Sequence, residues 1–159
     1  SAGSTGRMWM TWTTEGDEVK ALHTSASGFG LGATQNVGTP TKGQSLWHVA
    51  VDASLAQGTV LVNADGASSV FLKMVKPALS LQLKPGALKA KKPGKIKVRV
   101  TEAGVGLGGV KVTIKGAKCT TTNAGKCTLK VKPKKTGRLV VKASKPGYGE
   151  ARETIRVKG

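Results

Sequence analysis

The stretch Lys118–Lys132, KCTTTNAGKCTLKVK, contains both cysteines of the chain and constrains its fold most strongly. Residues Thr122–Gly125 supply turn chemistry, because Asn and Gly tolerate positive φ. After the turn, apolar and polar residues alternate through Val131 at the period of a half-buried strand. The stretch predicts a β-hairpin that sets Cys119 opposite Cys127, close enough for a disulfide. Two buried free thiols are the alternative.

The predicted disulfide indicates an oxidising compartment, because cytosolic thiols are kept reduced. The chain has no run of about 20 apolar residues of the kind that spans a bilayer, and it does not open with the charged-then-apolar pattern of a signal peptide. We therefore expect a secreted or cell-surface protein, with no transmembrane segment, whose leader or longer upstream region is absent from this sequence.

Charge divides the chain into two halves near Pro77. Residues 1–76 hold five basic and five acidic residues, whereas residues 77–159 hold 17 lysines and four arginines against three glutamates, a net charge of +18. All three tryptophans and both phenylalanines lie in the first half. Two domains are predicted, 1–76 and 77–159. Short alternating segments, frequent turn residues and the lack of a helical period indicate an all-β fold in both.

The first half contains two similar sets of three predicted strands. Trp9 and Trp47, in the first strand of each set, are 38 residues apart. A period near 40 residues with three or four strands per unit is typical of a propeller blade. The predicted strands are Arg7–Trp12, Glu18–Thr24 and Ala33–Val37, then Leu46–Asp52, Thr59–Asn63 and Ser68–Val75.

This half resembles the blades of sialidase-like bacterial β-propellers. The resemblance rests on GRMWMTW, on the loop SASGFGLGATQNVGTP, and on SLWHVAVD followed by VLVNADG. It implies propeller-like antiparallel blades that are incomplete alone, because closure takes at least four blades. The missing blades are expected on an upstream segment, on another chain or on further copies of this half. The half lacks the S-x-D-x-G-x-T-W box, and a small β-sandwich is the alternative.

The second half contains about seven short strands, each with one apolar face, which predicts two sheets packed face to face. The run from Val98 to Val157 resembles bacterial surface immunoglobulin-like domains of the invasin-like and carboxypeptidase-regulatory-like groups, especially those of actinobacteria. The matching motifs are Gly109–Ile114, Thr122–Lys126 and Gly147–Ala151. The resemblance implies an immunoglobulin-like β-sandwich that acts as a stalk, spacer or adhesion module.

Residues for catalysis are scarce. His23 and His48 are the only histidines, and both lie inside apolar strand patterns that favour packing or surface roles. No nucleophile elbow, metal-ligand spacing or P-loop is present. Sialidases use an arginine cluster and a tyrosine nucleophile, but the first half has only Arg7 and no tyrosine. The expectation is a protein that is not an enzyme and has no catalytic residues, no metal and no cofactor.

Outward-pointing basic residues are the main candidate for binding. Such a field attracts anionic polymers of a cell wall or matrix, and the excess of lysine suits diffuse attraction rather than bidentate reading of phosphates. Nucleic acid is not the expected target, because aromatic residues for base stacking are nearly absent. A solvated stalk is the alternative. The predicted polyanion-binding residues are Lys95, Lys97, Arg99, Lys111, Lys115, Lys130, Lys132 and Lys142.

The aromatic residues Trp9, Trp12, Trp47 and Phe29 are candidates for a ligand or partner face, with a role in the core as the alternative. Taken together, the sequence predicts a secreted or cell-surface bacterial binding or presentation module. One alternative is the non-catalytic C-terminal portion of a processed secreted enzyme, a glycosidase or protease. Another is a self-assembling structural subunit.

Overall fold

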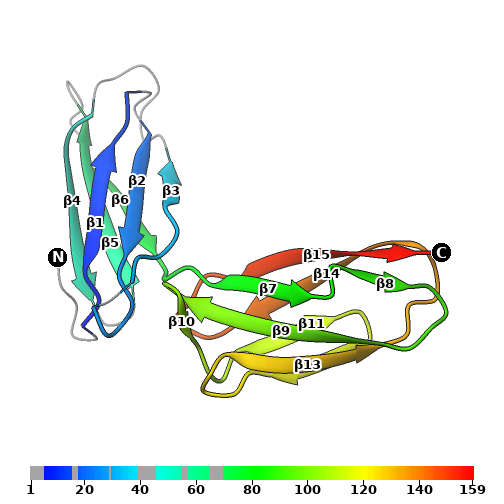
Figure 1. Cartoon of the computed structure of the whole chain (residues 1–159). Helices are drawn as coiled ribbons and strands as arrows, with labels where there is room; N and C mark the ends of the chain where they lie inside the picture. Colours follow the sequence, from blue (N-terminus) through cyan, green and yellow to red (C-terminus); the bar gives the residue numbers. More distant parts are fainter. Residues whose placement is uncertain (1–5, 16–17, 29, 39–45, 55–56, 65–69) are drawn as a thin grey trace. The chain divides into compact units, whose positions relative to one another are not determined.

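The computed structural model describes residues 6–15, 18–28, 30–38, 46–54, 57–64 and 70–159, which form strands and loops without a helix. The predicted all-β class is therefore confirmed for the described part of the chain. Two compact units are present, Ser1–Ala78 (the N-terminal unit) and Leu79–Gly159 (the C-terminal unit). The division falls within two residues of the change in composition near Pro77. Figure 1 shows both units and labels their strands except β12.

The N-terminal unit contains two antiparallel sheets of three strands each, in the sheet orders β1-β2-β3 and β4-β5-β6. Each sheet is formed by strands that follow one another in the chain (Figure 1). These are the six strands that the repeated pattern predicts. Their bounds are β1 Trp9–Thr13, β2 Val19–His23, β3 Gln35–Gly38, β4 Leu46–Ser54, β5 Gln57–Ala64 and β6 Val70–Val75.

The two sheets of the N-terminal unit bury their apolar faces against each other. Trp9, Val19 and Val37 of the first sheet share one hydrophobic cluster with Val75 of the second. The Trp9 indole lies against Gly58 of β5, where an added Cβ would come within 2.9 Å of the ring. Glycine at this position therefore lets the aromatic ring approach the facing strand.

This arrangement does not confirm the predicted propeller blades. Propeller blades are arranged around a central channel, whereas the two three-stranded sheets here share one hydrophobic cluster. The apolar face of each sheet is already covered by the other, which is the geometry of the alternative, a small β-sandwich. The repeat in the sequence therefore reflects two similar three-stranded sheets, and it gives no evidence for further blades.

The C-terminal unit contains two sheets. One is formed by β7, β9, β10 and β13, with β9 between β7 and β13, and the other has the order β12-β11-β14-β15-β8. We call them the first and second sheet of this unit. The bounds are β7 Ser80–Lys84, β8 Ala87–Lys89, β9 Gly94–Glu102, β10 Val105–Gly106, β11 Lys111–Ile114, β12 Ala117–Thr120, β13 Lys126–Val131, β14 Gly137–Ser144 and β15 Ala151–Lys158.

One hydrophobic core lies between these two sheets, as expected for a sandwich. Ile96, Leu129, Val141 and Ile155 are fully buried, and each alternates with exposed residues along its strand. The predicted strand alternation is therefore confirmed across this unit. The aliphatic side chains that the sequence places on one face of each strand are the ones that meet in the core.

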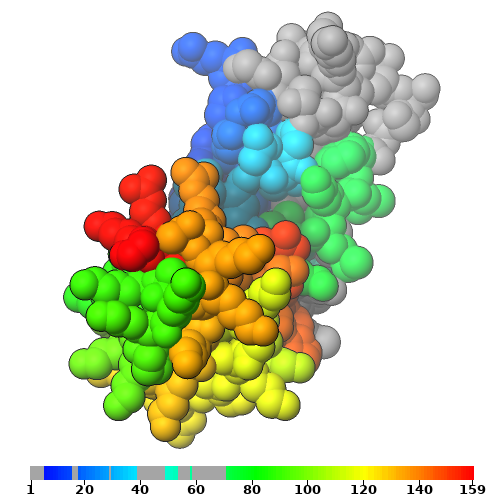
Figure 2. Space-filling model, turned by 90° about the vertical axis from the view of Figure 1, so that its right-hand side faces the viewer, coloured from blue at the N-terminus to red at the C-terminus, as the bar shows by residue number. Residues whose placement is uncertain are grey.

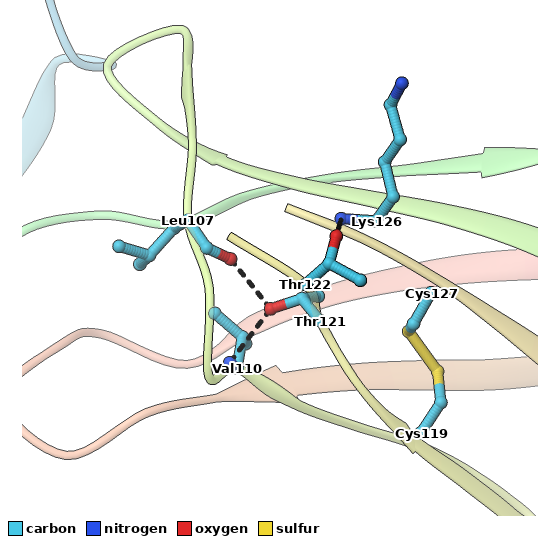
Figure 3. The surroundings of a disulfide bond; sticks show 7 residues. All are labelled: Leu107, Val110, Cys119, Thr121, Thr122, Lys126 and Cys127. Atoms are coloured by element: carbon cyan, nitrogen blue, oxygen red, sulfur yellow. Dashed lines mark hydrogen bonds between the residues drawn. A yellow bond between two sulfur atoms is a disulfide. The ribbon is translucent and has the colours of Figure 1, made fainter. Parts of the chain in front are cut away.

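The predicted hairpin at the cysteines is wrong, although its turn and its disulfide are present. Strand β12 pairs with β11, placing Cys119 beside Val112, and β13 pairs with β9, placing Cys127 beside Val98. The two cysteine strands thus belong to different sheets, and the disulfide joins those sheets at their edge (Figure 3). Strand β12 pairs with the preceding strand β11, whereas β13 pairs with the distant and longer β9, so the two cysteine strands do not pair with each other.

The turn between the cysteines packs tightly against another part of the chain. Gly125 has a φ of 75°, and a Cβ at this residue would collide with the Val100 carbonyl oxygen. The Val100 N–H donates a 2.7 Å hydrogen bond to the Gly125 carbonyl. The Thr121 hydroxyl donates to the Leu107 carbonyl at 2.7 Å and accepts from the Val110 N–H at 2.9 Å (Figure 3). These hydrogen bonds therefore hold in place the segment that passes from one sheet to the other.

Candidate polyanion-binding surface

The outer face of the first sheet of the C-terminal unit is basic. Its side chains alternate with the buried aliphatic residues of β7, β9 and β13, so they point to solvent. None of the charged residues on this face is acidic. The exposed cations are Lys84, Lys95, Lys97, Arg99, Lys126 and Lys130.

The outer face of the second sheet is basic as well. Its cations lie on strands that turn their aliphatic side chains toward the same core, so this face points away from the first one. Glu150 pairs with Arg152 next to this face. The exposed cations are Lys89, Lys111, Lys118, Arg138, Lys142, Arg152, Arg156 and Lys158.

The predicted binding residues are all exposed, and they lie on two opposite faces of the C-terminal unit and in its loops. Lys111 and Lys142 lie on the second sheet, and Lys115 lies in the turn that follows β11. Lys132 follows β13. The others, Lys95, Lys97, Arg99 and Lys130, lie on the first sheet. Alternation correctly predicts which side chains point outward, but it does not state to which of two opposite surfaces they belong.

Like charges lie directly opposite each other on both sheets. Lys95 is the cross-strand partner of Lys130, and Arg99 is the partner of Lys126. On the second sheet, Arg138 is the partner of Arg156. Each such pair is unfavourable, on the order of a few tenths of a kcal/mol to 1 kcal/mol. The folded unit therefore holds cations close together at a cost to its own stability.

Cations are densest at one end of the C-terminal unit, which we call the basic end. The β8–β9 segment, the β13–β14 segment and the C-terminal strand meet there, and Figure 2 faces this end. None of the charged residues at this end is acidic. Its cations are Lys89, Lys91, Lys92, Lys95, Lys115, Lys130, Lys132, Lys134, Lys135, Arg138 and Lys158.

Backbone hydrogen bonds hold the loops of the basic end in place. The Lys91 N–H donates to the Pro133 carbonyl at 2.7 Å, which joins the β8–β9 loop to the β13–β14 loop. The Ala90 N–H donates to the Lys158 carbonyl at 2.8 Å. Pro133 is itself buried. These hydrogen bonds connect the β8–β9 loop both to the β13–β14 loop and to the end of β15.

A cavity of about 620 Å³ opens at the basic end, between the β11–β12 turn and the β13–β14 loop. The side chains of Val131, Leu139 and Val157, at the end of the hydrophobic core, contribute to its lining. The lining includes no acidic residue, and its cations are Lys115, Lys130, Lys132, Lys134, Lys135 and Arg138. The lining thus combines apolar residues with six basic ones.

The three glutamates of this unit lie elsewhere. Glu102 is buried at the far end of β9 and accepts a hydrogen bond from the Tyr148 hydroxyl at 3.3 Å. The hydrogen bond from Arg152 holds the pKa of Glu150 below its ordinary value. Glu153 contacts its neighbouring backbone, at Thr154. None of these carboxylates neutralises the cavity lining.

The predicted aromatic face does not form among the described residues. Trp9 is buried in the core of the N-terminal unit, in agreement with the alternative interpretation. Trp12 is half-buried and lies three residues along the same strand, so it points to the opposite face. Phe29 and the side chain of Trp47 lie outside the described residues.

His23 has a packing role. It is fully buried, its ring centre lies 4.9 Å from that of Trp9, and its Nε2 accepts a hydrogen bond from the Ala78 N–H at 3.1 Å. Its Nδ1 therefore carries the proton and donates to the Thr24 carbonyl at 2.8 Å. The side chain of His48 lies outside the described residues.

The described residues contain no group of three histidine, cysteine, aspartate or glutamate side chains placed to hold a metal ion. In the same residues, no helix is long and apolar enough to cross a membrane.

Several basic residues of the site were not included in the sequence-based set. Lys126 and Arg138 show the same outward alternation as Lys130 and Lys142, so that signal was available for both. The cavity had no signal in the sequence. It depends on the β11–β12 turn lying beside a loop that is separated from it by more than ten residues.

Comparison with known proteins assigns no family. No protein-family model matches the chain, and no curated protein matches it. Among solved structures, the D00-D0 domain of intimin is similar with a TM-score of 0.40 and 14% sequence identity, over 98% of this chain and 80% of that one. This likeness assigns no function to the chain.

Proposed function

We propose that this chain is a non-catalytic binding module of a secreted or surface-displayed bacterial protein, and that its C-terminal unit binds anionic polymers. The candidate ligands are cell-wall or matrix polyanions, which are recognised by charge. The N-terminal unit, which carries no net charge over residues 1–76, has a separate role in presentation or contact with a partner.

The observation that carries the proposal is the placing of like charges opposite each other on both sheets and around the basic end. Such placing lowers the stability of the folded unit. A bound polyanion would reverse that cost, because it binds the folded arrangement of cations. Lysine predominates over arginine, which suits attraction to a charged chain in many registers rather than to one planar group.

Two further observations support a surface module of the immunoglobulin-like class. Strands β7, β9 and β13 share one sheet and β11, β14 and β15 share the other, which corresponds to the A, B, E and C, F, G strands of an immunoglobulin-type sandwich. The disulfide between Cys119 and Cys127 suits an oxidising compartment. Both are consistent with a bacterial surface domain that binds without catalysis.

Retention of the whole protein on immobilised heparin and on immobilised teichoic acid tests the proposal. We expect retention at low salt and elution over a moderate salt range, because attraction between exposed charges is screened within a Debye length of about 8 Å at physiological ionic strength. Weak retention that does not change with salt would contradict the proposal.

A matched pair of variants separates a specific surface from general charge. Lys95→Gln/Lys130→Gln removes two positive charges that face each other across β9 and β13 of the first sheet. Lys20→Gln/Lys76→Gln removes two positive charges from the N-terminal unit. The first variant should elute at clearly lower salt, and the second should elute close to the unmodified protein. Equal shifts of both variants would show that net charge alone causes retention.

A further inference from the structure

The cavity at the basic end differs from the basic faces in its chemistry. The faces are open rows of lysine and arginine. The residues that line the cavity include Val131, Leu139 and Val157 together with six basic residues, four of them from the β11–β12 turn and the β13–β14 loop and two, Lys130 and Arg138, from the adjoining strands. Its volume of about 620 Å³ lies within the range of small-molecule sites, roughly 300–1,000 Å³. The cavity can therefore enclose one chemical group, whereas a face attracts a length of polymer.

The lining restricts which group that is. Thr136 is the only hydroxyl residue in the lining, and no aromatic, amide or acidic side chain contributes. A neutral sugar would have neither a stacking platform nor the hydrogen-bonding side chains that such a ligand needs. Five of the six cations are lysines, which act as compact point charges, and a single arginine offers little bidentate recognition of carboxylates.

A dense group of point charges favours the anion with the highest charge. A phosphate monoester carries about −1.5 to −2 at pH 7, whereas a phosphate diester within a polymer or a sulfate ester carries a single charge. The apolar wall, in turn, favours a carbon skeleton attached to that anion over a free inorganic ion. Both features point to a phosphate at the end of a carbon chain.

We propose that the cavity at the basic end binds the terminal phosphate monoester of an anionic polymer, with the adjoining carbon atoms against Val131, Leu139 and Val157. This inference rests on the proposed function and adds to it. The faces hold the length of the polymer, and the cavity holds its end. The polymer would then bind with a defined direction along the unit.

Calorimetric titration of the whole protein with phenyl phosphate and phenyl sulfate at pH 7.5 and fixed ionic strength tests this inference. The two probes share an apolar ring and differ in charge. We expect phenyl phosphate to bind about tenfold more tightly, the effect of one additional charge among several partly solvated cations. The affinity for phenyl phosphate should fall as the pH decreases through the second phosphate pKa near 6, and that for phenyl sulfate should not.

Two variants with the same loss of charge locate the site. Lys134→Gln/Lys135→Gln changes exposed residues of the cavity, and Lys97→Gln/Lys126→Gln changes exposed residues of the first sheet. The first should lower the affinity for phenyl phosphate about tenfold, and the second should leave it within about twofold. Equal losses in both variants, or equal affinities for the two probes, would overturn the inference.

A polymer probe tests the chain end directly. A synthetic glycerol phosphate oligomer should bind more weakly after a phosphatase removes its terminal phosphate, and the cavity variant should abolish that difference. If removing the terminal phosphate has no effect while retention on heparin remains salt-dependent, the inference is wrong and the proposed function stands. If the unmodified protein is also not retained on heparin, both the inference and the proposed function are wrong.

Discussion

At the scale of single residues, Thr121 shows how one side chain links separate segments of the sandwich. It is 5% exposed, and its hydroxyl donates to the Leu107 carbonyl and accepts from the Val110 N–H. Its own backbone pairs with Val110 and Gly109. A buried hydroxyl that satisfies two backbone groups stabilises a fold mainly because its removal leaves both groups unpaired.

Replacing Thr121 with valine keeps the shape of the side chain and removes both hydrogen bonds. We expect Thr121→Val to lower the free energy of unfolding by about 1–3 kcal/mol, measured by urea denaturation. Thr122→Val is the matched control, because Thr122 is exposed and its hydroxyl accepts only a 3.4 Å contact from Lys126. Similar losses in the two variants would show that the Thr121 hydroxyl has no special role.

Glu18 of the N-terminal unit gives a prediction for pH. A 2.6 Å hydrogen bond from Lys20 and a 3.1 Å bond from Asn36 hold the pKa of Glu18 below its ordinary value of 4.5. Because the folded-state pKa is depressed, the ionised carboxylate stabilises the fold above pH 4.5, and this contribution is lost as the pH falls through the folded-state value.

Glu18→Gln should therefore be slightly less stable than the unmodified protein at pH 7, and the two should converge as the pH falls below 4.5. Thermal unfolding of both proteins over this pH range measures the difference. A gap between them that stays constant down to the lowest pH would contradict the assigned ion pair.

At the scale of elements, the segment from β12 to β13 carries the chain from one sheet to the other. The turn at Gly125 packs against Gly106 and Leu107 so closely that side chains larger than hydrogen do not fit at Gly106 or Gly125. The disulfide then ties the edge strands together on the core side. Turn, glycines and disulfide therefore act together to close one edge of the sandwich.

Removing the disulfide with Cys119→Ala/Cys127→Ala should destabilise the C-terminal unit. The cysteines are eight residues apart in sequence, and the chain-entropy model gives about 2–3 kcal/mol for so short a loop. The free energies of unfolding of the variant and of the reduced unmodified protein should agree within about 1 kcal/mol, once the side-chain packing that alanine removes is allowed for. Denaturation of both proteins measures them. Unchanged stability of both would show that the bond adds no constraint.

At the scale of the whole molecule, two units with separate hydrophobic cores carry different charges. The core of the N-terminal unit and that of the C-terminal unit share no residue. The net charge of +18 belongs to residues 77–159. The C-terminal unit should therefore fold and bind polyanions without the N-terminal unit.

A fragment of residues 79–159 should fold alone and elute from heparin at nearly the same salt concentration as the whole protein. A fragment of residues 1–78 should pass through unretained, because residues 1–76 have no net charge. Circular dichroism during heating tests whether the basic fragment unfolds cooperatively. Loss of cooperative unfolding, or early elution, would show that binding needs both units.

The sequence by itself determined the local features of this protein. Alternation predicted the strands and the side chains that point outward, as for Lys95 and Lys130, and turn residues predicted the turn at Gly125. Composition placed the division of the chain near Pro77. These features depend on a few neighbouring residues, because the period of a strand and the φ that a turn requires are local properties.

Only the tertiary structure decided which strand joins which sheet. That choice separated Cys119 and Cys127 into different sheets, sent Lys97 and Lys142 to opposite faces, and created the cavity beside Leu139. It also replaced the predicted propeller blades with two sheets packed face to face. The physical reason is that an apolar strand face can be buried against any complementary face, and the pairing with the most favourable burial is set by segments distant in sequence.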